Sequence, residues 1–241
     1  MPTAGCLIIG NEILSGKIVD TNSPFLAREL RALGVDLERI LTIPDDIAII
    51  AEEVLALSKA NDFVFTSGGI GPTHDDMTMD SIAKAFGLDV VLHQGMVDRL
   101  ERAQRGPLND AMKKMAMLPD GAQCIDAGDL WFPVVVVENV YIFPGIPELF
   151  QKKFESIRDR FSGVPFQLKK VYVKAYESDI ADELNALLVE FPQLLLGSYP
   201  RIAETDYRVM LTLESRDVDY LEKATTSLKK RLPPSIIHKI D

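Results

Sequence analysis

A glycine-rich segment, Thr66–Thr78 (TSGGIGPTHDDMT), constrains the fold of this chain more than any other part of its sequence. An aromatic and β-branched run, Phe63–Thr66, leads into the segment, and a helical pattern that stops at Gly87 follows it. The order strand, glycine-rich turn, helix exposes backbone N–H groups at a helix N-terminus, which favours anions such as phosphate. Glycines also let a ligand approach the backbone closely. The segment therefore predicts a phosphate-binding turn.

Two neighbouring carboxylates in this segment, Asp75 and Asp76, are unexpected beside a bound phosphate because like charges repel. A divalent cation held between the carboxylates and the phosphate removes this conflict. A purely structural alternative is that Asp76 caps the helix that begins near Thr78. We predict a metal-assisted site for a phosphorylated ligand.

Short apolar runs alternate with amphipathic helices through the first two thirds of the chain. The run Cys6–Ile9 is typical of a buried parallel strand, and Ser23 is expected to cap a helix that Gly34 ends. A strand at Arg39–Ile43 and a further helix precede the Phe63–Thr66 strand. This alternation predicts βαβ units and an α/β fold with a mostly parallel sheet.

Polar loops follow the first three predicted strands, at Gly10–Gly16, Pro44–Asp46 and Ser67–Asp76. Because ligands bind beyond the carboxyl ends of parallel strands, we expect these loops to meet at one edge of the sheet. Glu12 either contacts the ligand or is a solvated loop charge. Asp45 either acts in the site or is the one of the pair Asp45 and Asp46 that caps the helix starting at Ile47.

A second turn, Pro144–Pro147, precedes another helix and is a second candidate anion-binding N-terminus, because Pro147 suits a first helical position. Farther along, Gly163–Pro165 marks a change in composition. We predict one domain at 1–163 and a small α+β subdomain at 164–241, with strands near 169–175 and 207–213 and a helix at 218–232.

The chain has 241 residues and a net charge of -10, which argues against sequence-independent nucleic-acid binding and against an anionic membrane surface. Its two cysteines, Cys6 and Cys124, lack metal-ligand spacing and are typical of a reduced, cytoplasmic protein. No signal peptide is evident. Apolar helix faces favour a homo-oligomer, a dimer or a trimer.

Four motifs in this order resemble the MoaB/Mog molybdopterin-binding family. They are the Gly10–Asn22 region with Glu12, Gly16 and Asp20, the Pro44–Asp46 turn, the GGIGPTHDDMT segment at 68–78 and the Pro144–Pro147 turn. The combination is similar to the branch at the N-terminus of CinA and of eukaryotic FAD synthases. The resemblance implies a three-layer domain with a mostly parallel sheet and a KH-like C-terminal subdomain.

The segment 128–133, GDLWFP, stands where CinA proteins carry an NPxGTAPG motif, so the resemblance is nearer to the FAD synthase type. The chain ends at Asp241, where we expect no room for the amidase domain of CinA or for the reductase-like domain that makes FAD. Neither of those activities is therefore expected here.

The resemblance implies hydrolysis of the pyrophosphate bond of an adenine dinucleotide. FAD would give FMN and AMP, or ADP-ribose would give AMP and ribose 5-phosphate, with a divalent metal (Mg, Co or Mn) and optionally potassium. Asp45, Asp75 and Asp76 are the expected metal ligands and catalytic groups. The expected ligand-binding residues are Gly10, Glu12, Asn22, Ser67, Gly68, Gly69, Gly71, Pro72, Thr73, His74, Thr78, Pro144, Gly145 and Pro147. The alternatives are binding or adenylylation of molybdopterin, with a pterin nucleotide as ligand, and a non-catalytic nucleotide-binding module.

Overall fold

The computed structural model describes residues 1–104, 107–128, 130–201, 204 and 206–241. The chain forms two compact units, Met1–Gly163 and Val164–Asp241, which are described separately. The sequence of residues 94–117 indicates one or two helices with a break near Gly106–Pro107. The break lies partly outside the described residues, and two helices flank it.

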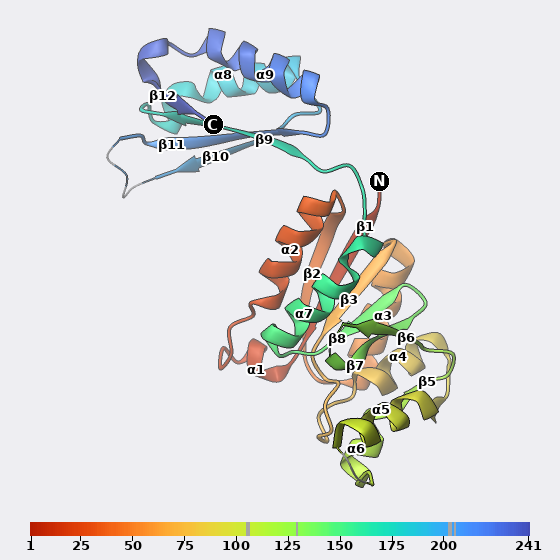
Figure 1. The fold of residues 1–241 in the computed structure, drawn as a ribbon. Helices are drawn as coiled ribbons and strands as arrows, with labels where there is room; N and C mark the ends of the chain where they lie inside the picture. Colours follow the sequence, from red (N-terminus) through yellow and green to blue (C-terminus); the bar gives the residue numbers. More distant parts are fainter. Residues whose placement is uncertain (105–106, 129, 202–203, 205) are drawn as a thin grey trace. The chain divides into compact units, whose positions relative to one another are not determined.

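The first unit alternates strands and helices along most of its length (Figure 1). Its elements are β1 (Thr3–Ile9), α1 (Asn11–Leu14), α2 (Asn22–Leu33), β2 (Asp36–Ile43), α3 (Ile47–Ala60), β3 (Phe63–Ser67), α4 (Thr78–Phe86), β4 (Val90–Leu92), α5 (Gln94–Gln104), α6 (Asp110–Met115), β5 (Met117–Pro119), β6 (Gln123–Ala127), β7 (Leu130–Val137), β8 (Val140–Phe143) and α7 (Pro147–Ile157). A 3-10 turn, Arg158–Arg160, follows α7.

A six-stranded sheet in the order β2-β1-β3-β8-β7-β6 forms the centre of this unit. β2, β1, β3 and β8 run parallel, and β7 and β6 continue the sheet antiparallel to their neighbours. The predicted α/β fold with a mostly parallel sheet is confirmed. A separate two-stranded sheet pairs β4 with β5.

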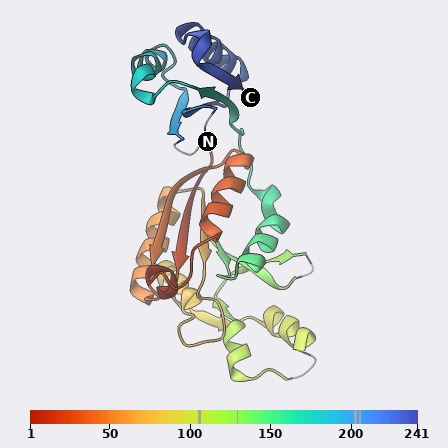
Figure 2. The same cartoon turned by 90° about the vertical axis from the view of Figure 1, so that its left-hand side faces the viewer.

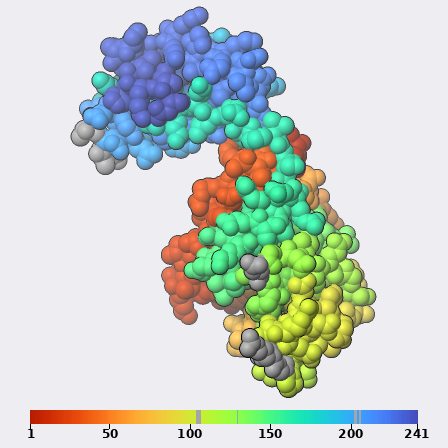
Figure 3. Space-filling model, in the orientation of Figure 1, coloured from red at the N-terminus to blue at the C-terminus, as the bar shows by residue number. Residues whose placement is uncertain are grey.

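Helices cover both faces of the central sheet (Figures 1 and 2). Apolar residues of α2 and α7 fill one face, and those of α3, α4 and α5 fill the other. In β1, Leu7 and Ile9 face the core formed with α3, α4 and α5, whereas Cys6 and Ile8 face the core formed with α2 and α7. Because both faces of the strand are buried, its sequence is a continuous apolar run. α2 and α7 also lie side by side on the face drawn in Figure 3.

The predicted helix ends are partly confirmed. Gly34 and Gly87 end α2 and α4 in the left-handed conformation, and the Asp46 side chain accepts hydrogen bonds from two N–H groups of α3. The prediction that Ser23 is an N-cap is wrong, because α2 begins at Asn22. The Asp20 carboxylate caps the first turn instead, accepting from the backbone N–H groups of Asn22 and Ser23.

An aromatic cluster centred on Phe65 fills the core between the sheet and α7. Phe65 has ring-centroid distances of 4.9 Å to Phe161 and 5.9 Å to Phe154. Two residues beyond Phe161, the Gly163 N–H donates to Leu33 O at 2.7 Å. A Cβ at Gly163 would lie 2.1 Å from Gly34 O, so this position requires glycine.

The second unit is an antiparallel sheet in the order β10-β11-β9-β12 that packs against two helices. Its elements are β9 (Gln167–Val173), α8 (Glu177–Glu190), β10 (Leu195–Pro200), β11 (Val209–Ser215), α9 (Val218–Arg231), a 3-10 turn at Pro234–Ile236 and β12 (Ile237–Ile240). The predicted strands and helices are present, and β12 was not expected from the sequence. Within the described parts of the chain, no helix combines the length and apolar character that crossing a membrane requires.

Candidate functional site

The loops that follow β1, β3 and β8 meet at one edge of the central sheet. The last residues of these parallel strands are in register, with Ile8 beside Ser67 and Ser67 beside Phe143. The loop after β2 joins them, because the Asn11 N–H donates to the Asp45 carboxylate at 2.8 Å. The predicted convergence of the strand-end loops is therefore confirmed.

Gly68 begins the glycine segment in a conformation that other residues do not adopt easily. Its φ is +110°, and a Cβ there would lie 2.2 Å from Ile9 O. Its N–H donates to Phe143 O at 3.1 Å, and the Gly145 position packs against it. Neighbouring strand ends thus surround Gly68 and fix the path of the segment that follows it.

Thr78, the first residue of α4, closes the segment from the other side. Its hydroxyl donates to Gly68 O at 2.9 Å, and its N–H donates to Gly69 O at 3.0 Å. Thr78 is fully buried. We expected it to hold phosphate, but in this structure its hydroxyl and N–H hold the backbone of the glycine segment.

Asp76 folds back onto its own loop and does not cap α4. Its Oδ2 accepts from the Thr73 N–H at 2.8 Å and from the Thr73 hydroxyl at 2.6 Å. Met77 is the N-cap residue of α4 and contributes no side-chain bond. The capping alternative for Asp76 is therefore wrong.

Asp75 and His74 point toward solvent rather than into a cavity. Their side chains are 63% and 98% exposed, and His74 Nδ1 lies 4.0 Å from Asp75 Oδ1. The pKa of Asp75 lies below its ordinary value, first because of the Thr73 side chain and then because of a backbone hydrogen bond. Of the Asp75–Asp76 pair, only Asp76 lines the pocket described next.

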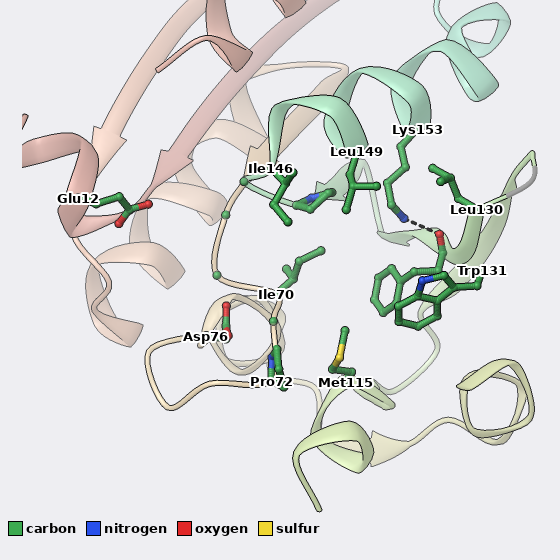
Figure 4. Close-up of a pocket in the computed structure, with 16 residues that line it drawn as sticks. Glu12, Ile70, Pro72, Asp76, Met115, Leu130, Trp131, Ile146, Leu149 and Lys153 are labelled. Carbon is green, nitrogen blue, oxygen red and sulfur yellow. Dashed lines mark hydrogen bonds between the residues drawn. The ribbon is translucent and has the colours of Figure 1, made fainter. Parts of the chain in front are cut away.

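A pocket of about 490 Å³ lies beside the glycine segment, a volume typical of small-molecule sites (Figure 4). Its wall contains eight of the residues predicted for the site: Glu12, Gly68, Gly69, Gly71, Pro72, Asp76, Pro144 and Gly145. It also contains eight that were not predicted: Ile70, Met115, Leu130, Trp131, Phe132, Ile146, Leu149 and Lys153.

The two ends of this pocket differ in chemistry (Figure 4). Glu12 and Asp76 lie at one end, with the backbone of the glycine segment and the start of α7. The N-cap residue of α7, Ile146, contributes no side-chain cap. Pro147 has no N–H, and the N–H groups of Leu149 and Phe150 donate to Ile146 O, so the Glu148 N–H is the group of this turn that is left for an anion. The other end is apolar and is formed mainly by residues of β7 and α7.

Lys153 is the buried cation of the apolar end. It is 2% exposed, and its Nζ donates to Phe132 O and to Pro133 O at 2.6 Å each. It also lies 4.6 Å from the centroid of the Phe132 ring. Desolvation by burial lowers the pKa of Lys153 to about 7. The two carbonyls lie near an irregularity in β6–β7 pairing, and Lys153 supplies their hydrogen bonds.

Four other predicted residues, Gly10, Asn22, Asp45 and Ser67, bond to neighbouring loops and do not line the pocket. The Asn22 amide donates to Ser67 Oγ and to Gly145 O, Asp45 accepts from Asn11, and the Gly10 N–H donates to Ile43 O. These contacts stabilise the loops that carry the pocket. Pro147 opens α7 as expected.

Sequence reasoning missed the apolar end because its residues belong to no phosphate-binding or metal-binding motif. One signal was available, since Trp131 and Phe132 lie in the GDLWFP segment that departs from the CinA pattern. Lys153 gave no signal, because nothing in its spacing predicts that a lysine on α7 is buried.

No three His, Cys, Asp or Glu side chains come together to hold a metal ion among the residues that the structure describes. Two carboxylates, Glu12 and Asp76, line the same pocket. In many Mg²⁺ sites the protein contributes one or two carboxylates, and phosphate and water supply the remaining oxygen ligands. Glu12 and Asp76 thus supply the type of oxygen donor that a divalent cation binds, and a metal at Asp45, Asp75 and Asp76 stays a prediction.

A mostly parallel sheet between two helical layers, with a pocket at its strand ends, defines an α/β domain of the doubly wound class. Residues 5–162 match the family described as a probable molybdopterin binding domain, and residues 165–241 match the middle domain of FAD synthase. The chain belongs to the probable molybdopterin binding domain family, joined to an FAD synthase middle domain.

Three proteins of similar sequence agree with this family assignment. A protein of Archaeoglobus fulgidus is 36% identical over 93% of this chain and 95% of its own length. A probable FAD synthase of Caenorhabditis elegans is 33% identical over 98% of this chain and 51% of its own length. A CinA-like protein of Citrifermentans bemidjiense is 33% identical over 94% of this chain and 57% of its own length. The chain thus spans about half the length of these two named relatives.

A solved structure is also similar. The protein CinA of Thermoplasma acidophilum, described as of unknown function, has 28% identity and a TM-score of 0.62 over 66% of this chain and 98% of its own. The resemblance to the CinA and FAD synthase branch is confirmed.

Proposed function

We propose that the chain hydrolyses the pyrophosphate bond of an adenine dinucleotide, FAD to FMN and AMP or ADP-ribose to AMP and ribose 5-phosphate. One observation carries the proposal: the glycine segment, the start of α7, Glu12 and Asp76 all line the same pocket. The chain also matches FAD synthases, which are named for forming FAD, and this match supports a flavin nucleotide as the ligand.

Backbone groups do most of the phosphate binding in this proposal. The N–H groups of Gly69–Gly71 and the Glu148 N–H in the first turn of α7 would orient the phosphates and stabilise the charge that develops during cleavage. Thr78 and Asn22 would keep these groups in place through their bonds to Gly68 and Gly145. Preorganised donors of this kind need no rearrangement during the reaction.

Glu12 and Asp76 would hold a divalent cation (Mg, Co or Mn) together with phosphate oxygens and water. A bound cation neutralises phosphate charge and makes water more acidic. The Thr73 bonds occupy Oδ2 of Asp76 and fix its carboxylate, which leaves Oδ1 to face a ligand. Potassium and a homo-oligomeric assembly, a dimer or a trimer, belong to the same proposal.

The test incubates the purified protein with FAD or with ADP-ribose and Mg²⁺, Mn²⁺ or Co²⁺, and measures AMP by chromatography. We expect AMP from at least one dinucleotide, and a loss of turnover of about 100-fold or more in Asp76→Asn and Glu12→Gln. Glu52→Gln, an exposed change on α3, is the matched control. Absence of AMP with every metal and both dinucleotides would overturn the proposal.

A pterin is the second candidate ligand, favoured by the family description of residues 5–162. In that case the pocket binds or adenylylates molybdopterin and cleaves no dinucleotide. Calorimetry with a pterin, set beside the AMP assay, separates the two. Pterin binding without dinucleotide turnover supports the second candidate. Nucleotide binding without turnover, unchanged in Asp76→Asn, would instead indicate a non-catalytic nucleotide-binding module.

A further inference from the structure

The apolar end of the pocket is organised around Trp131. Its ring packs edge-on against Phe132, with centroids 5.5 Å apart and planes at 83°. Trp131 lines the pocket and is 45% exposed as a whole, while Phe132 is buried. A large aromatic side chain in this position offers a face on which a flat ring can stack.

Lys153 adds one polar group to this apolar surface. In its protonated form Lys153 has three N–H donors, and the bonds to Phe132 O and Pro133 O use two of them. Because Lys153 lines the pocket, its remaining donor is within the reach of a ligand. The two carbonyl bonds fix Nζ beside the aromatic wall, and Figure 4 draws the bond to Phe132 O.

The surroundings of Lys153 favour the edge of a ring over a phosphate. Its side chain is 2% exposed, and Leu130, Trp131, Phe132 and Leu149 share its part of the wall. Bringing a multiply charged phosphate into such surroundings strips its hydration, which one lysine compensates poorly. A ring with a carbonyl oxygen or ring nitrogen at its edge gives up much less water and can still accept a hydrogen bond.

We propose that this end of the pocket binds a heteroaromatic ring of the ligand, stacked on Trp131 and hydrogen-bonded at an acceptor on its edge by Lys153. The phosphates of the same ligand lie at the glycine segment. The assignment of the phosphates rests on the proposed function, whereas ring binding does not. An isoalloxazine, a pterin and an adenine share this chemistry, and the test distinguishes them.

Trp131 is the single tryptophan of the chain, so its fluorescence reports on this end of the pocket. FMN, AMP, 6-hydroxymethylpterin, ribose 5-phosphate and pyrophosphate are titrated separately into the full-length protein, with correction for light absorbed by each probe. We expect saturable quenching by at least one ring-bearing probe and none by the two ring-free probes. The probe that quenches at the lowest concentration identifies the ring.

Calorimetry with variants tests the two contacts separately. Trp131→Ala is expected to weaken binding of the quenching probe about tenfold or more and to leave pyrophosphate binding unchanged, while Trp131→Phe keeps most of the affinity. Lys153→Met is expected to weaken ring binding as well. Lys152→Met is the matched control, because Lys152 is exposed on the same helix.

Several results would overturn the inference. Fluorescence changes caused equally by ring-free probes would mean that phosphate occupies the aromatic end. Absence of quenching by all three ring-bearing probes would mean that no ring stacks there. AMP release that is unaffected by Trp131→Ala would reject ring stacking while the proposed function stands. Ring binding without any AMP release would reject the proposed function and leave the inference intact.

Discussion

The side-chain amide of Asn22 donates to the hydroxyl of Ser67 at 2.9 Å, joining the first turn of α2 to the end of β3. The same Nδ2 donates to Gly145 O, also at 2.9 Å, and so reaches the turn before α7. Asn22 is 4% exposed, and these partners lie far from it in sequence. One buried side chain thus connects three segments behind the pocket.

Replacing Asn22 by alanine is predicted to lower the free energy of unfolding by about 1–3 kcal/mol, because Ser67 and Gly145 lose a buried donor. Urea denaturation followed by circular dichroism measures the change. Asn11→Ala is the control, since only the backbone of Asn11 bonds to Asp45. Equal stability of the two variants would contradict a structural role for the Asn22 amide.

Gly68→Ala is predicted to destabilise the chain by roughly 2 kcal/mol or more, because φ is +110° and the new Cβ would meet Ile9 O. Gly145→Ala is the matched comparison on the same pocket wall. A Cβ there would lie 3.5 Å from the nearest atom, which is ordinary contact. Thermal unfolding of both variants measures the difference, and a smaller loss for Gly68→Ala than for Gly145→Ala would refute the backbone argument.

Lys153 is predicted to make stability depend on pH. The pKa of Lys153 is about 7 in the folded chain, against an ordinary value of 10.5 that applies to the unfolded chain. Between pH 7 and pH 10.5 the unfolded state therefore binds more protons than the folded state. Stability of the wild-type chain should therefore rise with pH, relative to Lys153→Met, by about 1.4 kcal/mol per pH unit. Urea titrations of both proteins at pH 7, 8 and 9 give this difference. A difference that stays constant over this range would show that Lys153 keeps its proton when buried.

The two cysteines are predicted to react unequally with a thiol reagent. Cys6 is fully buried in β1, and burial strongly raises its thiol pKa. Cys124 is partly buried, and its pKa is also raised, first by desolvation. At pH 8 we expect slow labelling of Cys124 and none of Cys6, with both labelled in urea. Mass spectrometry of peptides measures the sites, and native labelling of Cys6 would contradict its buried position.

The sequence predicted those parts of the fold that local rules determine. Alternating elements predicted the parallel sheet, and Gly34, Gly87 and Asp46 marked helix ends where the structure has them. The Ser23 prediction failed because Asp20, outside the helix, offers a carboxylate that accepts two N–H groups at once. Local competition between neighbouring cap residues is hard to resolve from their order alone.

The candidate site was predictable only where backbone geometry specifies it. The glycine segment and the Pro144–Pro147 turn follow strands, so their positions at the sheet edge were predictable. The distinction between Asp75 and Asp76 was not, because it depends on which way the loop turns when Thr73 bonds to Asp76. Lys153 and Trp131 come together only through the packing of α7 against β7, which local sequence does not encode.

The bond between Gly163 and Leu33 has a practical consequence for dissecting the chain. A fragment that stops at Gly163 retains both this attachment and Phe161, whose ring packs against Phe65 in the aromatic cluster. A fragment shortened to residue 160 would lose the two together and expose the rings that Phe161 covers. The earliest safe place to cut lies immediately after Gly163, and shorter fragments should aggregate when expressed.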